Sequence, residues 1–329
     1  MDSSSEEETL AMIMLVHISQ SLKKKRKPKS VWVRNWILRR NTAGAYNSLL
    51  RELEQEDPRS LKNFLRMDKA NFDILLEKIS PYIEKKCTPM RNSIPVGEKL
   101  ALTLRYLASG DSYSSLQFLY RVPRNTICNF VPCVCKAIYD VPTTERNWRN
   151  IQEEFMAKWQ FPHCIGAIDG KHIAIRAPNN TGSEFFNYKK FFNIILLALV
   201  DANCKFIFVD VGANGRAGDA AVYANSQLSY ALQHNTLNTP QPTPLEGRHE
   251  LVPSVVVGDD AFQLKPHLMK PYPMRDLSYE KRVFNYRLSR ARRVSENAFG
   301  LLVNRFCIFQ KPPQVSPEVA SSVVLASVS

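Results

Sequence analysis

Ile165-Gly-Ala-Ile-Asp-Gly-Lys-His-Ile173 places one acid, Asp169, inside an apolar run. Residues 163–168 and 172–175 both have an extended pattern, which predicts a strand around this acid. An Asp beside a Gly is common in turns, but a bulge or a strand interior fits equally well here because the extended pattern resumes at once. A buried carboxylate without a partner is costly, so we expect a metal ion or a cation beside Asp169.

Two further acids occur in matching contexts. Asp259 follows Val255-Val-Val-Gly, a short apolar strand, at the carboxyl end where open α/β sheets collect ligands. Only one of two adjacent acids can point inward from a pleated strand. We choose Asp259 and expect Asp260 to face solvent or a loop amide.

Glu296 lies on a helix predicted over residues 287–305. Arg292 stands four residues before it, so an exposed surface ion pair is the ordinary interpretation. The alternative is a position facing a cleft, because Glu296 borders the apolar stripe of the helix. That stripe comprises Leu288, Ala291, Ser295, Ala298 and Leu302.

Three carboxylates suit two divalent metal ions, Mg²⁺ or Mn²⁺, which activate a nucleophilic oxygen and stabilise the leaving oxygen in a displacement at phosphorus. Asp169, Asp259 and Glu296 are therefore the candidate catalytic and metal-binding residues. The candidate contacts to DNA phosphates are Lys171, His172, Arg287, Arg290, Arg292 and Arg293. For His172, a hydrogen bond within the strand is an equal alternative.

Two other acids are candidates for an accessory role. Asp219 fits the N-cap of a helix running to about residue 233, and we favour that structural interpretation over a functional one. Asp260 is the second accessory candidate because it adjoins Asp259.

The 329 residues carry a formal net charge of +13, and 44% of them are hydrophobic. The segment 23–51 has ten basic residues and no acid, which favours a polyanionic partner, nucleic acid rather than membrane. No apolar run approaches the roughly 18 residues of a membrane span. Seven scattered cysteines without zinc-site spacing predict reduced thiols in an intracellular protein.

A run of five consecutive cations is typical of a nuclear localisation signal. It comprises Lys23, Lys24, Lys25, Arg26 and Lys27. A solvated basic tail that touches phosphates is the alternative, and both roles are compatible. We therefore predict a nuclear protein, with the cytoplasm left open as a second location.

The chain divides by pattern into an arm, a helical domain and an α/β domain. We expect a disordered basic arm over 1–30, a helical domain over 31–160, a nuclease domain over 161–312 and a tail over 313–329. The predicted helices include 43–56, 64–83 and 96–108. A helix-turn-helix-like part covers about 112–139, with Ser112 and Asn125 as N-caps, and plain helix packing is its alternative.

The α/β domain is predicted to hold a mixed sheet. Strands over 194–200 and 205–211 form a hairpin through Asp201-Ala-Asn-Cys204. A loop is expected over 234–253 before the strand that precedes Asp259. The fold class is thus α/β, with the catalytic domain following an all-helical one.

Five blocks carry a resemblance to a known family. They are Gly166-Ala-Ile-Asp-Gly-Lys-His-Ile with Arg176-Ala-Pro, Tyr188-Lys-Lys with Phe192-Asn-Ile-Ile-Leu, Gly218-Asp-Ala-Ala-Val-Tyr, Val257-Gly-Asp-Asp-Ala-Phe, and Phe284-Asn-Tyr-Arg with Arg293-Val-Ser-Glu-Asn-Ala-Phe-Gly and Arg305-Phe. In order and spacing, the chain resembles the PIF/Harbinger superfamily of DDE transposases, and specifically the Harbinger transposase-derived nucleases of animals. The resemblance covers about residues 30–312.

The resemblance implies an RNase H-like catalytic core whose DDE triad is Asp169, Asp259 and Glu296. It also implies cleavage of DNA with Mg²⁺ or Mn²⁺, and a separate Myb/SANT-like protein as partner; a homo-oligomer is left open. The family usually has a small residue after the second acid, where this chain has Asp260, so either acid of that pair could be the ligand. A domesticated, catalytically silent nuclear DNA-binding or scaffold protein is the alternative to an active metal-dependent endonuclease.

Overall fold

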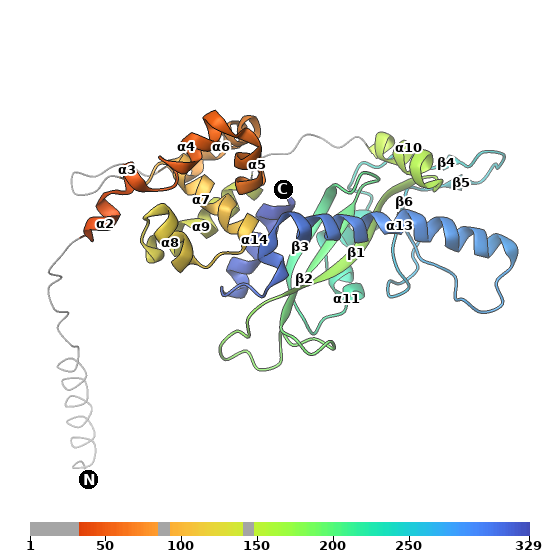
Figure 1. The fold of residues 1–329 in the computed structure, drawn as a ribbon. Helices are drawn as coiled ribbons and strands as arrows, with labels where there is room; N and C mark the ends of the chain where they lie inside the picture. Colours follow the sequence, from red (N-terminus) through yellow and green to blue (C-terminus); the bar gives the residue numbers. More distant parts are fainter. Residues whose placement is uncertain (1–32, 85–92, 141–147) are drawn as a thin grey trace, which may run out of the picture. The chain divides into compact units, whose positions relative to one another are not determined.

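The computed structural model describes residues 33–84, 93–140 and 148–329 (Figure 1). The chain forms two compact units, one ending at Arg39 and the other spanning Arg40–Ser329. In its described part, the first unit contains the short helix α2 (Asn35–Leu38).

The predicted nuclear localisation signal lies outside the described residues, so it stays a prediction. This holds for each of its five cations, which are Lys23, Lys24, Lys25, Arg26 and Lys27. The arm predicted over 1–30 also lies outside them.

The second unit begins with a run of helices. They are α3 (Arg40–Ala43), α4 (Leu49–Glu56), α5 (Pro58–Leu65), α6 (Lys69–Ile83), α7 (Val96–Ser109), α8 (Tyr113–Tyr120), α9 (Arg124–Tyr139) and α10 (Trp148–Trp159). The helix predicted over 64–83 is wrong at its start, because Arg66 has a left-handed backbone (φ 58°) that ends α5. Asp68 then caps α6 by accepting a hydrogen bond from the Asn71 amide.

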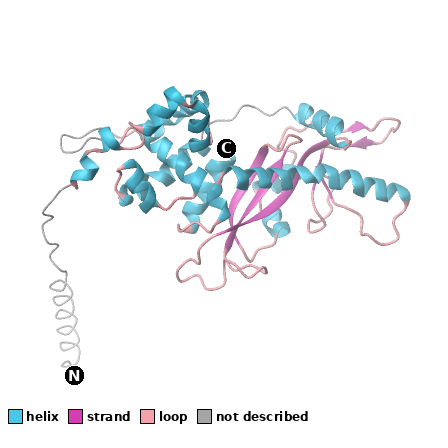
Figure 2. Cartoon of the chain, in the orientation of Figure 1, coloured by secondary structure: helices cyan, strands magenta, loops and turns pink. Residues whose placement is uncertain are grey.

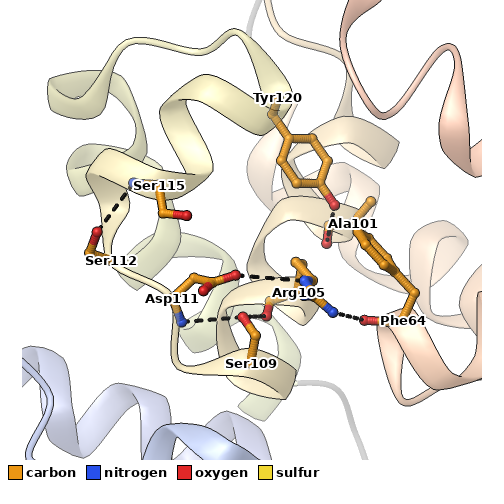
Figure 3. Close-up of polar contacts among 8 residues, drawn as sticks. All are labelled: Phe64, Ala101, Arg105, Ser109, Asp111, Ser112, Ser115 and Tyr120. Atoms are coloured by element: carbon orange, nitrogen blue, oxygen red, sulfur yellow. Dashed lines mark hydrogen bonds and ion pairs between the residues drawn. The ribbon is translucent and has the colours of Figure 1, made fainter.

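The helix-turn-helix-like part contains α8, a turn of three residues and α9. Ser112 caps α8 as predicted, by accepting from the Ser115 amide (Figure 3). The prediction of Asn125 as an N-cap was wrong, because α9 already begins at Arg124, directly after Pro123. The proline fixes a backbone angle suited to a helix start, and the Arg124 amide bonds to the Gln117 side chain at 2.8 Å.

Polar contacts fix α8 against its neighbours. Figure 3 shows Tyr120 of α8 donating to the Ala101 carbonyl of α7 at 3.4 Å. Arg105 of α7 donates to the Phe64 carbonyl of α5 at 3.4 Å and lies 3.8 Å from the carboxylate of Asp111. These bonds tie three helices together around the apolar core, as plain helix packing requires.

A five-stranded mixed sheet follows, in the order β3-β2-β1-β6-β7. Its strands are β1 (Cys164–Ala174), β2 (Asn193–Val200), β3 (Phe206–Asn214), β6 (Val255–Val257) and β7 (Leu268–Met269). The first three are antiparallel neighbours, whereas β6 runs parallel to β1 and β7 parallel to β6. This mixed sheet is consistent with a DDE or RNase H-like domain.

The predicted β2–β3 hairpin is confirmed. Asp201 closes it, because its Oδ1 accepts from the Asn203 and Lys205 amides at 2.8 Å each. The segment predicted as a loop over 234–253 contains a small second hairpin of β4 (Thr243–Pro244) and β5 (Leu251–Val252).

Helices cover both faces of the main sheet. α13 (Tyr279–Arg305) lies across the strands (Figure 2) and packs its buried stripe on β1. Its predicted stripe is confirmed, because Leu288, Ala291, Ser295, Ala298 and Leu302 are all buried. The other face is covered by α11 (Asp219–Ala224) and α12 (Gln227–Gln233), whose Val222 and Leu228 join a core with Ile168 of β1.

Residues 313–329 differ from the predicted tail. After the short helix η1 (Cys307–Gln310), they contain α14 (Pro317–Val328), which contacts both α9 and β3. Ala320 and Val324 belong to the core between the sheet and α13, whereas Val323 and Ala326 belong to the core of the helical region. The two regions predicted as separate domains therefore share one helix within a single compact unit.

No helix in the described ranges is long and apolar enough to cross a membrane. The six cysteines in these ranges are free thiols.

Candidate active site

Asp169 lies within β1, so of the three local conformations compatible with its sequence, the strand interior is the one that forms. Ser295 of α13 donates a hydrogen bond to its Oδ2 at 3.3 Å, and its Oδ1 accepts from the Gly170 amide at 2.9 Å. Burial raises the pKa of the Asp169 carboxyl to about 6. The nearby Arg292 guanidinium opposes this rise in pKa, and the Asp259 and Asp219 carboxylates add to it.

Asp259 reaches the same place through strand register. Ala167 of β1 pairs with Val257 of the parallel β6, and each acid stands two residues beyond its member of the pair. Asp259 stands two residues past the end of β6, and its charge acts on Asp169, so the two carboxylates lie near each other.

Asp260 turns away from that pair, as the pleat predicts. Its side chain is 76% exposed, and its Oδ1 lies 3.0 Å from the ammonium of Lys270. The expected loop amide is instead bound by Asp259, whose Oδ1 accepts from the Ala261 amide at 3.0 Å.

Glu296 forms the surface ion pair rather than facing a cleft. Its side chain is 53% exposed, and its Oε1 accepts a 2.6 Å hydrogen bond from Arg292 Nη2. Because the Arg292 charge also acts on Asp169, this arginine lies near both Glu296 and Asp169. Glu296 is thus linked to Asp169 through a cation.

Asp219 is not the N-cap that the sequence predicted. Gly218 occupies that position, and Asp219 is the first residue of α11. Its carboxylate lies against Gly170, where an added Cβ would come within 2.1 Å of Asp219 Oδ1. The predicted helix to residue 233 is also interrupted, because Ser226 caps the separate helix α12.

Asp219 lies near both other aspartates, because its charge acts on Asp169 and the Asp259 charge acts on it. Asp219 Oδ1 is buried and has no hydrogen-bond partner. Burial raises the pKa of Asp219, and the nearby His172 opposes that shift.

The predicted DNA-contacting cations have different surroundings. Arg287 and Arg293 are exposed on α13, whereas Arg290 Nη1 bonds to Gln160 Oε1 at 3.4 Å. Lys171 Nζ lies 5.7 Å from the centre of the Phe299 ring. His172 Nδ1 lies 2.7 Å from the Asn193 side-chain nitrogen of β2, so its hydrogen bond is to the neighbouring strand rather than within its own strand as the alternative had it.

Two residues near the carboxylates were not predicted as site residues. Ser295 was assigned only to the buried stripe of α13, yet it donates to Asp169. Lys189 stands in the Tyr188-Lys-Lys block and acts electrostatically on Asp219 and His172. The sequence signal for Lys189 was a family motif without an assigned role.

Within residues 33–84, 93–140 and 148–329, no three His, Cys, Asp or Glu side chains form a group that could hold a metal ion. Glu296 is paired with Arg292, so it does not join the aspartates.

Residues 168–329 match a family described as the DDE superfamily endonuclease. Among curated proteins, "Protein ALP1-like" of Arabidopsis thaliana is 25% identical over 262 residues, which cover 77% of this chain and 64% of that protein. "Putative nuclease HARBI1" of Bos taurus and of Homo sapiens are each 28% identical over 188 residues, which cover 56% of this chain and 50% of those proteins. The chain thus spans between half and two thirds of the length of these relatives. No solved structure matches it. These matches confirm the family resemblance that the motif blocks predicted.

Proposed function

We propose that the chain is a transposase-derived DNA endonuclease that depends on divalent metal ions, on the premise that its residues 168–329 match the DDE superfamily endonuclease family. Its catalytic core is RNase H-like, and it hydrolyses or transfers phosphodiester bonds. Asp169, Asp259 and Glu296 are the catalytic acids.

The observation that carries this proposal is the register that brings Asp169 and Asp259 together from β1 and β6. Two carboxylates, one on β1 and one just after β6, would provide hard oxygen donors close together. Mg²⁺ and Mn²⁺ prefer such ligands.

The surroundings of Asp169 fit a bound cation. Its pKa is raised to about 6 because burial outweighs the nearby Arg292 charge, so the ionised carboxylate is not fully compensated by the protein. Asp169 and Asp259 would hold the metal, and Glu296 would join them after releasing Arg292. When bound, the metal supplies charge stabilisation and a more acidic nucleophile at phosphorus.

The arginines of α13 are proposed to contact DNA, and other residues are proposed to position the acids. Arg287, Arg290 and Arg293 line α13 beside the acids and would follow the phosphates, while Ser295 orients Asp169 through its hydrogen bond. Arg292 holds Glu296 until metal binds. We place the protein in the nucleus, with a Myb/SANT-like partner that supplies sequence recognition.

One observation favours a second function, a catalytically silent nuclear DNA-binding or scaffold protein. In the structure the Glu296 carboxylate is paired with Arg292, so the three acids do not converge. An exposed ion pair contributes less than about 1 kcal/mol, however, so metal binding can displace the arginine. Metal affinity therefore separates the two functions.

The test is a calorimetric titration of Mn²⁺ into the wild-type protein and into Asp169→Asn and Asp259→Asn. Asp260→Asn is the matched control, because it removes the adjacent acid that pairs with Lys270. We expect binding to wild type and Asp260→Asn and loss of binding in the other two variants, with the fold checked by circular dichroism. No binding to wild type, or equal binding by all variants, would establish the silent alternative.

A further inference from the structure

Residues 187–191, here called the Tyr188 tip, form a closed turn before β2. The Asn187 amide donates to the Phe191 carbonyl at 3.0 Å, and the Lys190 amide donates to the Asn187 carbonyl at 3.1 Å. The Phe191 amide donates to Asn187 Oδ1 at 3.2 Å, and Asn187 itself is buried. The three residues between these anchors, Tyr188, Lys189 and Lys190, are thus presented on a fixed backbone.

Tyr188 is an exposed aromatic side chain that is held in place by contacts with its neighbours. It is 78% exposed, yet its ring meets the His172 ring of β1 edge-on, with centroids 5.8 Å apart. Lys189 Nζ lies 5.4 Å from the centre of the Tyr188 ring. Single exposed aromatics are ordinary, but one held beside an anchored histidine and a cation has a defined direction.

The histidine that contacts Tyr188 is itself fixed. Asn193 is fully buried and its side-chain nitrogen lies 2.7 Å from His172 Nδ1, so the ring cannot swing away from β1. Burial lowers the pKa of His172. His172 therefore holds the tyrosine in place, and the tip's own cations are its two lysines.

The Tyr188 tip lies near the carboxylates. His172 stands three residues beyond Asp169 on β1, which is roughly 10 Å along a strand. That length is about three stacked nucleotides of one DNA strand. The tip contains two lysines and no acid, and the Lys189 charge reaches Asp219, so the tip offers positive charge beside an acidic site that DNA phosphates must approach.

We propose that the Tyr188 tip binds an unpaired segment of the DNA substrate, with a base stacked on Tyr188 and the flanking phosphates held by Lys189 and Lys190. Proteins that bind single strands combine aromatic platforms with cations along the backbone, and the tip has both within three residues. The inference rests on the proposed function for its choice of DNA as ligand. It adds a positioning residue that holds the strand a few nucleotides from the acids.

The test measures binding of a fluorescent single-stranded oligonucleotide by anisotropy, with EDTA present so that neither metal nor cleavage contributes. A second oligonucleotide of the same length carries tetrahydrofuran abasic sites in place of nucleosides. Wild type is compared with Tyr188→Ala and Tyr188→Phe. Tyr230→Ala is the matched control, because Tyr230 is 58% exposed and also contacts a histidine, His234.

Tyr188→Ala should weaken binding of the base-bearing strand about 5- to 150-fold, the loss typical of one stacked base. Tyr188→Phe and Tyr230→Ala should remain within about twofold of wild type, and Tyr188→Ala should bind the abasic strand as wild type does. Lys189→Ala should weaken binding of both strands equally and reduce the salt slope by about 0.7.

Equal losses on both strands in Tyr188→Ala, or no loss on either, would overturn the inference, as would wild-type protein that binds neither strand. Melting curves of the variants check that the fold persists. Because metal is chelated, the result is independent of the Mn²⁺ titration. A silent protein could still stack a base on Tyr188, and an active nuclease could lack this contact.

Discussion

The acids of the candidate site come from different elements and have different environments. Asp169 lies on β1 and Asp259 just after β6, whereas Glu296 lies on helix α13. Asp169 is partly buried, with a pKa raised to about 6 and a single hydrogen bond from another residue's side chain, donated by Ser295. Glu296 is 53% exposed and already bonded to Arg292 at 2.6 Å. Asp169 is therefore fixed on a strand with no ion pair of its own among the described residues, whereas Glu296 must exchange its partner before it can act.

The largest effect should follow from removing a strand-borne acid. Asp169→Asn keeps the size of the side chain and its bond with Ser295 but removes the charge. Metal-dependent nicking of supercoiled DNA should fall by at least about 10³-fold, as for other charged groups central to a reaction. Asp260→Asn, measured in parallel, should keep nearly full activity. Equal activity of Asp169→Asn and wild type would remove the strand pair from the mechanism.

Glu98 is a buried acid on a helix, so it shows whether burial or position on a strand raises the pKa of a carboxyl in this protein. Glu98 of α7 is 1% exposed, with Arg40 Nε at 3.5 Å, and burial raises its pKa to about 7 despite that arginine. Burial, rather than position on a strand, thus sets the raised pKa of Asp169 and Glu98 alike.

The sign of the resulting pH dependence follows from proton binding. A carboxyl with a folded-state pKa of about 7 and an unfolded value near 4.5 is protonated more in the folded state between these pH values. The free energy of unfolding therefore falls as pH rises through this window, by about 3 kcal/mol in total. Glu98→Gln lacks this loss.

Urea denaturation at several pH values checks this prediction. The stability of Glu98→Gln relative to wild type should rise by about 3 kcal/mol between pH 4.5 and pH 7 and then level off. Glu296→Gln, at an exposed helical position, is the control for the substitution itself. A flat difference for Glu98→Gln would mean that Glu98 stays ionised in the folded protein.

Packing also differs between β1 and α13, and substitutions at two glycines can measure the difference. Gly170→Ala would place a Cβ within 2.1 Å of Asp219 Oδ1, whereas Gly300 on α13 has nothing within 4 Å of such an atom. Gly170→Ala should lower the free energy of unfolding by about 2 kcal/mol through overpacking. Gly300→Ala should raise it by roughly 0.5 to 1 kcal/mol, because alanine favours the helix. Thermal denaturation of both variants measures these shifts, and a stabilising Gly170→Ala would place the Asp219 carboxylate elsewhere.

The sequence predicted the parts of the fold that depend on local pattern. The strands β2 and β6 are unbroken apolar runs and the stripe of α13 is periodic, so these elements were predictable. That Asp169 and Asp259 lie near each other follows only once Ala167 is paired with Val257. β7 is only two residues long and depends on pairing with β6, so it carries no signal of its own. α14 is built from Val, Ala and Ser, and its amphipathic role appears only when two cores meet on it.

The sequence predicted the site less well where the position of a side chain depends on a tertiary contact rather than on a local sequence pattern. Asp219 has the sequence of an N-cap, but Gly170 leaves space on β1 for its carboxylate. Glu296 borders the stripe of α13, and the presence of Arg292 one turn earlier decides which way it points. Such outcomes depend on side chains that are distant in sequence or on competition between partners.

The smallest expected effect is on metal affinity, when Glu296 no longer has to release Arg292 before it binds a metal ion. Arg292→Gln removes both the partner of Glu296 and a positive charge near Asp169. Loss of an exposed ion pair frees Glu296 at a cost below about 1 kcal/mol, so Mn²⁺ should bind severalfold more tightly. Arg293→Gln is the matched control, because Arg293 is exposed next to it and makes no contact with Glu296 among the ion pairs of the described residues. Calorimetric titration of both variants measures the difference. Unchanged affinity in Arg292→Gln would mean that Glu296 does not compete between arginine and metal, and weaker affinity would assign Arg292 to positioning the acids for metal rather than withholding one of them.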